Sequence, residues 1–116
     1  MLSHEKLDVY QRSIEFLAIA LRIAEKLPRG QAPLVDQLRR AAMPISLNIA
    51  EGSGRSPGSP DRARFRGIAR GSAMECAAIC DVLGLVDNRF CERAEKAKQL
   101  LKSIVSILTA VCGGRG

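Results

Sequence analysis

The chain is 116 residues long, 47% of its residues are apolar, and its formal net charge is +6. Charges interrupt the apolar stretches, as Arg22 does between residues 16 and 24, so no segment is predicted to span a membrane. The first residues lack the basic start and apolar run of a secretory signal, which favours a cytoplasmic location. The length suits one domain over residues 1–116, and the positive charge makes a polyanion a candidate partner.

Four cysteines, Cys76, Cys80, Cys91 and Cys112, do not follow a metal-binding pattern. Cys76 and Cys80 are one helical turn apart, but no Cys-x-x-Cys or His-x-x-x-His partner accompanies them. Their places in apolar patterns indicate free thiols that pack in a core. The sequence therefore predicts no metal site and no cofactor.

Apolar residues recur every three or four positions in four segments, which predicts four helices. The expected helices cover residues 8–27, 33–51, 60–86 and 88–112. Pro33 suits the first turn of the second of these helices. Neither the alternation typical of strands nor an internal repeat is present, which indicates an all-α chain.

The link between the second and third helices carries the clearest boundary signals. Gly52 is expected to end the second helix in a left-handed conformation. Ser59, followed by Pro60 and Asp61, is expected to cap the third helix. The glycines here do not make a phosphate-binding loop, because the lysine and the preceding strand of such a loop are absent.

The third helix is expected to have two packing faces. The core face is predicted to contain Phe65, Ile68, Ser72, Cys76, Ile79 and Leu83. A second stripe of mostly small residues comprises Gly67, Gly71, Ala78 and Leu85. Small residues let a neighbouring backbone approach closely, so the second stripe indicates a contact between subunits.

The fourth helix follows Asp87 and Asn88, whose side chains suit a helix cap. Four helices joined by short links are expected to alternate in direction. The predicted fold is therefore an all-α, antiparallel, up-and-down four-helix bundle.

The most distinctive motifs are QLRRAA at residues 37–42, NIAEG at 48–52 and IARGSAME at 68–75. LDVYQ at residues 7–11 and LGL at 83–85 belong to the same pattern. In combination these motifs resemble the four-helix bundle family of proteins encoded by intervening sequences of bacterial 23S ribosomal RNA genes. That family is related to the accessory variability protein of diversity-generating retroelements, and the resemblance covers nearly the whole chain.

The resemblance implies a homopentamer of antiparallel four-helix bundles. In the retroelement branch it implies a basic surface that binds nucleic acid, RNA or DNA, and a reverse transcriptase as the protein partner. For the ribosomal-insert branch the resemblance implies no defined biochemical activity.

Five polar residues of the family motifs lie on helices whose other faces are apolar. They are Arg40, Asn48, Glu51, Ser72 and Glu75. A buried polar group needs hydrogen-bonded partners, and the second and third helices are expected to run side by side. The preferred interpretation is a structural network across these two helices, and the alternative is a ligand site.

The strongest basic concentration lies around the start of the third helix. It comprises Arg55, Arg62, Arg64, Arg66 and Arg70. Arg62, Arg66 and Arg70 recur every four residues, a spacing that forms a ridge able to follow phosphates without reading bases. The alternative interpretation is a solvated face on which arginine serves solubility.

No catalytic set can be assembled around the single histidine, His4, and the Glu-x-x-His pairs of di-iron bundles are absent. We therefore expect a non-enzymatic, oligomeric nucleic-acid-binding accessory protein. One alternative is a structural or protein-partner adaptor that binds no nucleic acid. Another is a metal-dependent nuclease, which would depend on Glu51 or Glu75.

Overall fold

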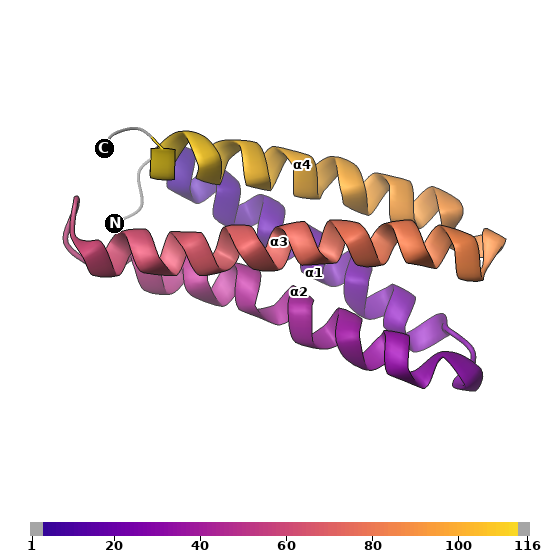
Figure 1. The fold of residues 1–116 in the computed structure, drawn as a ribbon. Coiled ribbons are helices and arrows are strands. Elements are labelled where there is room, and N and C mark those ends of the chain that lie inside the picture. Colours follow the sequence, from indigo (N-terminus) through magenta and orange to yellow (C-terminus); the bar gives the residue numbers. More distant parts are fainter. Residues whose placement is uncertain (1–3, 114–116) are drawn as a thin grey trace.

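The computed structural model describes the backbone of residues 4–113 and the side chains of residues 7–110 (Figure 1). This part of the chain is helical and contains no strand. Its helices are α1 (His4–Lys26), α2 (Ala32–Ser53), α3 (Pro60–Val86) and α4 (Cys91–Gly113), with short 3₁₀ turns η1 (Arg29–Gln31) before α2 and η2 (Asn88–Phe90) before α4. None of these helices is long and apolar enough to cross a membrane.

The four predicted helices are confirmed. The bounds of α3 agree with the prediction, whereas α1 begins four residues earlier than expected, at His4. Pro33 lies in the first turn of α2, as predicted, and α2 continues through Pro44 as far as Ser53. The fourth segment begins with the η2 turn, so α4 itself starts at Cys91.

Side-chain caps fix two of the helix starts. The Ser59 hydroxyl accepts a hydrogen bond of 3.1 Å from the backbone N–H of Arg62, which caps α3 as predicted. Asp87 Oδ1 accepts from the backbone N–H of Arg89 at 3.0 Å and so caps η2, the turn that leads into α4. An N-cap of this kind contributes about 1 kcal/mol.

The prediction that Gly52 ends α2 in a left-handed conformation is wrong. Gly52 is a buried residue inside α2, and the cap residue Gly54 has a right-handed φ of −85°. Among the described glycines, only Gly58 in the following loop has a positive φ, at 78°. Gly52 instead serves packing, because a Cβ atom built on it would lie 3.1 Å from the Cβ of Phe65 on α3.

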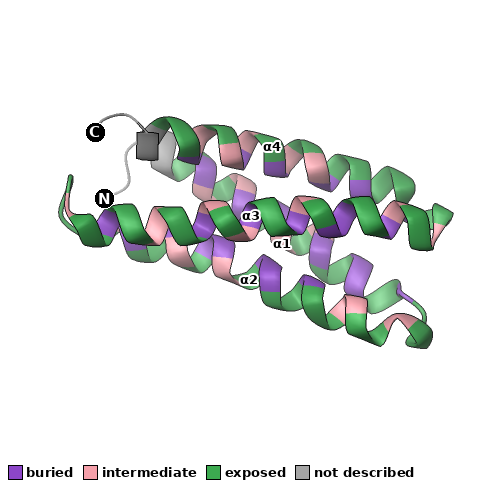
Figure 2. Cartoon of the chain, viewed as in Figure 1, coloured by how far each residue is buried: buried purple, intermediate pink, exposed green. Residues whose placement is uncertain are grey.

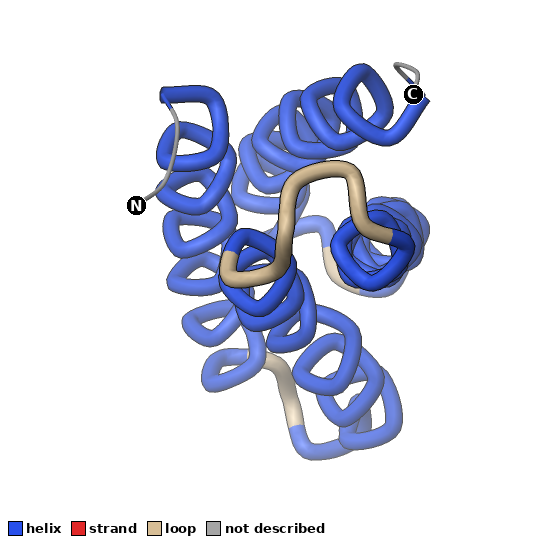
Figure 3. Tube along the Cα trace, turned by 90° about the vertical axis from the view of Figure 1, so that its left-hand side faces the viewer, coloured by secondary structure: helices blue, strands red, loops and turns tan. Residues whose placement is uncertain are grey.

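The helices pack around one shared core. α2 packs along α3, α3 along α4, and α1 against both α2 and α4. Figure 3 shows this arrangement from one end, and Figure 2 shows that buried residues recur at intervals along the helices. The largest fully buried side chains include Phe16, Ile23, Leu38, Ile45, Leu83, Leu101 and Ile104.

The core face of α3 differs from the prediction in its first half. Cys76, Ile79 and Leu83 are buried as expected, but Ile68 is exposed, and Phe65 and Ser72 are only half-buried. Ala69 and Ala73 take the fully buried positions instead. Small side chains suit these positions because a protein interior is closely packed.

Candidate nucleic-acid interface

The candidate arginines lie at one end of the molecule, around the loop that connects α2 to α3. The start of α1 and the end of α4 lie at the same end (Figures 1 and 3). We call this region the arginine end. It contains Arg55 in the loop and Arg62, Arg64, Arg66 and Arg70 on α3.

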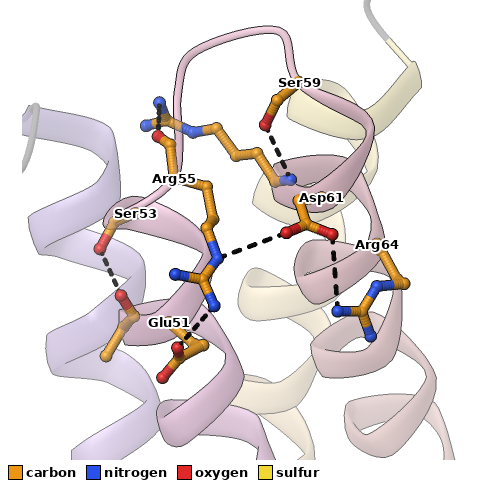
Figure 4. A network of polar contacts seen from close by, with 8 residues as sticks. Glu51, Ser53, Arg55, Ser59, Asp61 and Arg64 are labelled. Atoms are coloured by element: carbon orange, nitrogen blue, oxygen red, sulfur yellow. Dashed lines mark hydrogen bonds and ion pairs between the residues drawn. The ribbon is translucent and has the colours of Figure 1, made fainter.

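Ion pairs join the end of α2 to the first turns of α3 through Arg55 (Figure 4). Arg55 Nη2 lies 2.9 Å from Glu51 Oε2, and Arg55 Nε lies 3.6 Å from Asp61 Oδ2. The other oxygen of that carboxylate, Asp61 Oδ1, lies 3.6 Å from Arg64 Nη2. A single carboxylate therefore faces two guanidinium groups.

Both guanidinium groups also contact the same aromatic ring. The central carbon of the Arg64 guanidinium lies 4.4 Å from the centre of the Phe65 ring, and that of Arg55 lies 5.0 Å from it. Together with Glu51 and Asp61, these residues form what we call the arginine–aspartate cluster. Each cation–π contact at an exposed site is worth roughly 0.5–1 kcal/mol.

The main effect of the arginine–aspartate cluster is to orient two positive charges, because its ion pairs add little to the stability of the fold. The side chains of Arg55 and Arg64 keep 40% and 58% of their surface exposed. Exposed ion pairs contribute only about 0–1 kcal/mol each, because water screens them. What the cluster provides is a pair of oriented, accessible guanidinium groups whose planar donors suit phosphate oxygens.

Arg62 is not exposed, contrary to the prediction of a phosphate-facing ridge. It retains only 6% of its surface, and its Nη1 donates a hydrogen bond of 3.1 Å to the backbone carbonyl of Arg55. Its Nε is buried and has no partner among the described residues. Because the Arg62 backbone is also bonded to Ser59, this residue ties the loop to the start of α3.

The two remaining members of the predicted ridge are partly covered by neighbouring helices. Arg70 Nε donates a hydrogen bond of 2.7 Å to Thr109 Oγ1, which links α3 to α4. Arg66 is half-buried and packs near Gly52 of α2. Exposed guanidinium surface at this end is therefore concentrated on Arg55 and Arg64.

The polar motif residues of α2 bond to partners four residues away, within α2 or in the loop that follows it. Arg40 Nη2 pairs with Asp36 Oδ2 at 2.6 Å, Asn48 Nδ2 donates to the backbone carbonyl of Pro44 at 2.7 Å, and Glu51 pairs with Arg55. These contacts all span four residues, the spacing that brings side chains together on a helix. They do not form the predicted network across α2 and α3.

The two α3 members of that predicted network lie apart from these bonds. Ser72 is half-buried and Glu75 is exposed. Arg55, in the loop after α2, forms an ion pair with Asp61 of α3, and Asp61 was not a predicted site residue. The Asp36–Arg40 and Glu51–Arg55 spacings were visible in the sequence, whereas the roles of Phe65 and Thr109 were not.

The two buried thiols, Cys76 and Cys80, are not activated. Burial raises the pKa of Cys76 to about 12 and that of Cys80 to about 11, so both stay protonated at neutral pH. Cys91 is exposed, and its thiol donates to Asn88 Oδ1 at 3.1 Å. The described side chains include no group of three or more His, Cys, Asp or Glu residues that could hold a metal ion.

Comparison with known proteins identifies the family. A search among curated proteins found no match. Residues 5–110 match the family model described as 23S rRNA-intervening sequence protein, a match that includes α2, α3 and the arginine end. The chain therefore belongs to the 23S rRNA-intervening sequence protein family.

Proposed function

We propose that the protein is a non-enzymatic accessory protein that binds the phosphates of nucleic acid at its arginine end. The observation that carries this proposal is the pair of exposed guanidinium groups, Arg55 and Arg64, held over the ring of Phe65. A cation that is already oriented loses less conformational entropy when it binds a ligand. Arginine also matches the geometry of phosphate oxygens.

Local charge supports the same proposal. The arginine end carries five arginines, and the carboxylates that pair with them are Glu51 and Asp61. An excess of positive charge at one end of an elongated molecule attracts polyanions and speeds their association. Arg66 and Arg70 contribute to that field even though neighbouring helices cover part of their surface.

The aromatic residues favour backbone contacts over base reading. Phe16 and Phe90 are buried, Tyr10 is half-buried, and the half-buried ring of Phe65 lies under two guanidinium groups. The chain has no other aromatic residue on which exposed bases could stack. We therefore expect binding that is sensitive to salt and weakly dependent on sequence.

Assembly is the second part of the proposal. We infer a single-domain, antiparallel, up-and-down bundle that forms a homopentamer, in which each arginine recurs around the axis and weak contacts become multivalent. A groove of about 360 Å³ between α3 and α4, lined by Met74, Ala77, Leu101 and Val105, supports contact with a second copy. Gly67 and Gly71 also face open space in the single chain.

Light scattering tests the assembly. The wild type is expected to have five times the mass of the chain. Met74→Glu places a charge in the groove and is expected to lower that mass, whereas Met43→Glu changes an equally exposed methionine, at 50%, on α2 and is expected to leave it unchanged. A monomeric wild type would refute the oligomer.

Fluorescence anisotropy tests the nucleic-acid proposal. Labelled structured RNA and duplex DNA are titrated across a salt series with the wild type and with Arg55→Gln combined with Arg64→Gln. The matched control combines Arg29→Gln with Arg93→Gln, two exposed arginines in η1 and α4 that change the net charge equally. Circular dichroism and light scattering show whether each variant stays folded and assembled.

The expected result is weaker binding by the arginine-end variant alone. Losing two phosphate contacts per site should flatten the slope of log K against log salt concentration by about 1.8 for duplex DNA. The control should retain most of the wild-type slope. Absence of salt-sensitive binding by the wild type would overturn the proposal and make a protein-partner adaptor the leading function.

The same samples test the non-enzymatic part of the proposal. Labelled RNA incubated with the protein and Mg²⁺ is expected to keep its length. Cleavage that depends on Mg²⁺ and is abolished by Glu51→Gln or Glu75→Gln would instead establish a nuclease.

A further inference from the structure

We propose that Asp61 is a resident competitor of phosphate, whose carboxylate occupies the position between Arg55 and Arg64 that a nucleic-acid phosphate takes on binding. This inference rests on the proposed function, since it concerns regulation of the same site. It assigns the two arginines as phosphate ligands and Asp61 as the group that must be displaced.

The geometry of the carboxylate carries the inference. Its two oxygens face different guanidinium groups, Oδ2 toward Arg55 Nε and Oδ1 toward Arg64 Nη2, each at 3.6 Å (Figure 4). The two non-bridging oxygens of a phosphodiester can face the same two donors. A carboxylate between two arginines therefore resembles the ligand that we propose.

The two contacts of Asp61 are long enough to be exchanged. A strong charge-assisted hydrogen bond between a guanidinium and a carboxylate spans about 2.7–2.9 Å. The Glu51 contact of Arg55 reaches that range at 2.9 Å, whereas both Asp61 contacts are longer. The Asp61 side chain is also 58% exposed, so water and ions reach it directly.

The arginines keep other supports when Asp61 leaves. Arg55 retains its pair with Glu51 and its contact with Phe65, and Arg64 retains its contact with the same ring. Displacing Asp61 therefore requires only rotation of one exposed side chain in the first turn of α3. The Ser59 cap holds that turn independently.

Competition by Asp61 therefore makes the affinity of the wild type for nucleic acid lower than the affinity that Arg55 and Arg64 would have without it. Asp61→Asn removes the competing charge and keeps the side-chain size. Each exposed ion pair is weak, so relief of two of them should raise affinity for a labelled RNA hairpin by about threefold to tenfold at constant salt. Glu25→Gln changes the net charge equally at an exposed position on α1 and should change affinity by less than about twofold.

A double-mutant cycle separates this inference from a general charge effect. Asp61→Asn is combined with Arg55→Gln and Arg64→Gln, and the gain is expected to disappear because nothing remains for the carboxylate to block. Thermal unfolding checks that Asp61→Asn stays folded.

The outcomes that refute this inference differ from the outcome that refutes the proposed function. If the wild type binds in a salt-sensitive manner and Asp61→Asn binds no better than Glu25→Gln, the competitor role is refuted and the proposed function stands. A gain that persists without Arg55 and Arg64 refutes it as well. If the wild type shows no salt-sensitive binding, the proposed function falls, and the inference with it.

Discussion

Replacing Gly52 by alanine probes how closely α2 and α3 approach at the arginine end. The added Cβ would lie 3.1 Å from Phe65 Cβ and 3.5 Å from the backbone carbonyl oxygen of Arg62. Phe65 Cβ is bonded directly to its backbone, so α3 itself must shift to relieve the first contact. Overpacking of this kind costs about 1–3 kcal/mol, and alanine regains at most about 1 kcal/mol of helix propensity.

We therefore expect Gly52→Ala to lower the free energy of unfolding by about 1–2 kcal/mol. Gly67→Ala is the matched control, because a Cβ there has no neighbour within 4 Å in the single chain. In a chain that is not assembled, it should raise the free energy of unfolding by about 0.5–1 kcal/mol through helix propensity alone. The two variants should thus change stability in opposite directions.

Urea unfolding followed by far-UV circular dichroism measures both variants at matched protein concentration, since assembly also contributes to stability. A Gly52→Ala protein as stable as Gly67→Ala would refute the close approach of the two helices. Light scattering serves as a second readout. A loss of assembled mass in Gly67→Ala would place the small-residue stripe of α3 in a subunit interface.

Three further predictions concern the interior and one surface pair. Arg62→Ala should lower the free energy of unfolding by about 1–3 kcal/mol in urea titrations, because a buried hydrogen bond and its packing are lost; unchanged stability would contradict its role in tying the loop. Burial raises the pKa of Cys76 and Cys80 above the ordinary value of 9.0, so the folded state holds protons that the unfolded state releases. Stability should fall as pH rises from about 9 toward 12, and combined Cys76→Ala and Cys80→Ala substitutions should flatten that decline in urea titrations at several pH values. Lys98 Nζ lies 2.7 Å from Asp81 Oδ1, joining α4 to α3, yet a double-mutant cycle should assign this exposed pair no more than about 1 kcal/mol.

Local patterns in the sequence were sufficient for the helices. Apolar residues three or four positions apart located all four helices. The Ser59-Pro60 signal located the start of α3 at the residue where the structure has it. Pro33 in the first turn of α2 and Asp87 before η2 were predicted in the same way. These features depend on backbone groups within a few residues, so neighbours in the sequence determine them.

The concentration of arginines was also readable from the sequence, but the role of each arginine was not. A spacing of four residues shows that Arg62, Arg66 and Arg70 share a side of α3. It does not show that this side faces the α2–α3 loop and α4, where Arg62 is buried and Arg70 bonds to Thr109.

Packing between helices determined the surroundings of individual side chains, which the sequence did not show. The sequence predicts a helix end at Gly52, yet Gly52 lies inside α2 and packs closely against Phe65 of α3. It predicts only a helix start at Asp61, yet Asp61 lies between two arginines. Sequence periodicity gives the direction of a side chain about its own helix axis. Whether that direction meets solvent, a ring or a second helix depends on the distance and rotation between helices, which only the tertiary structure sets.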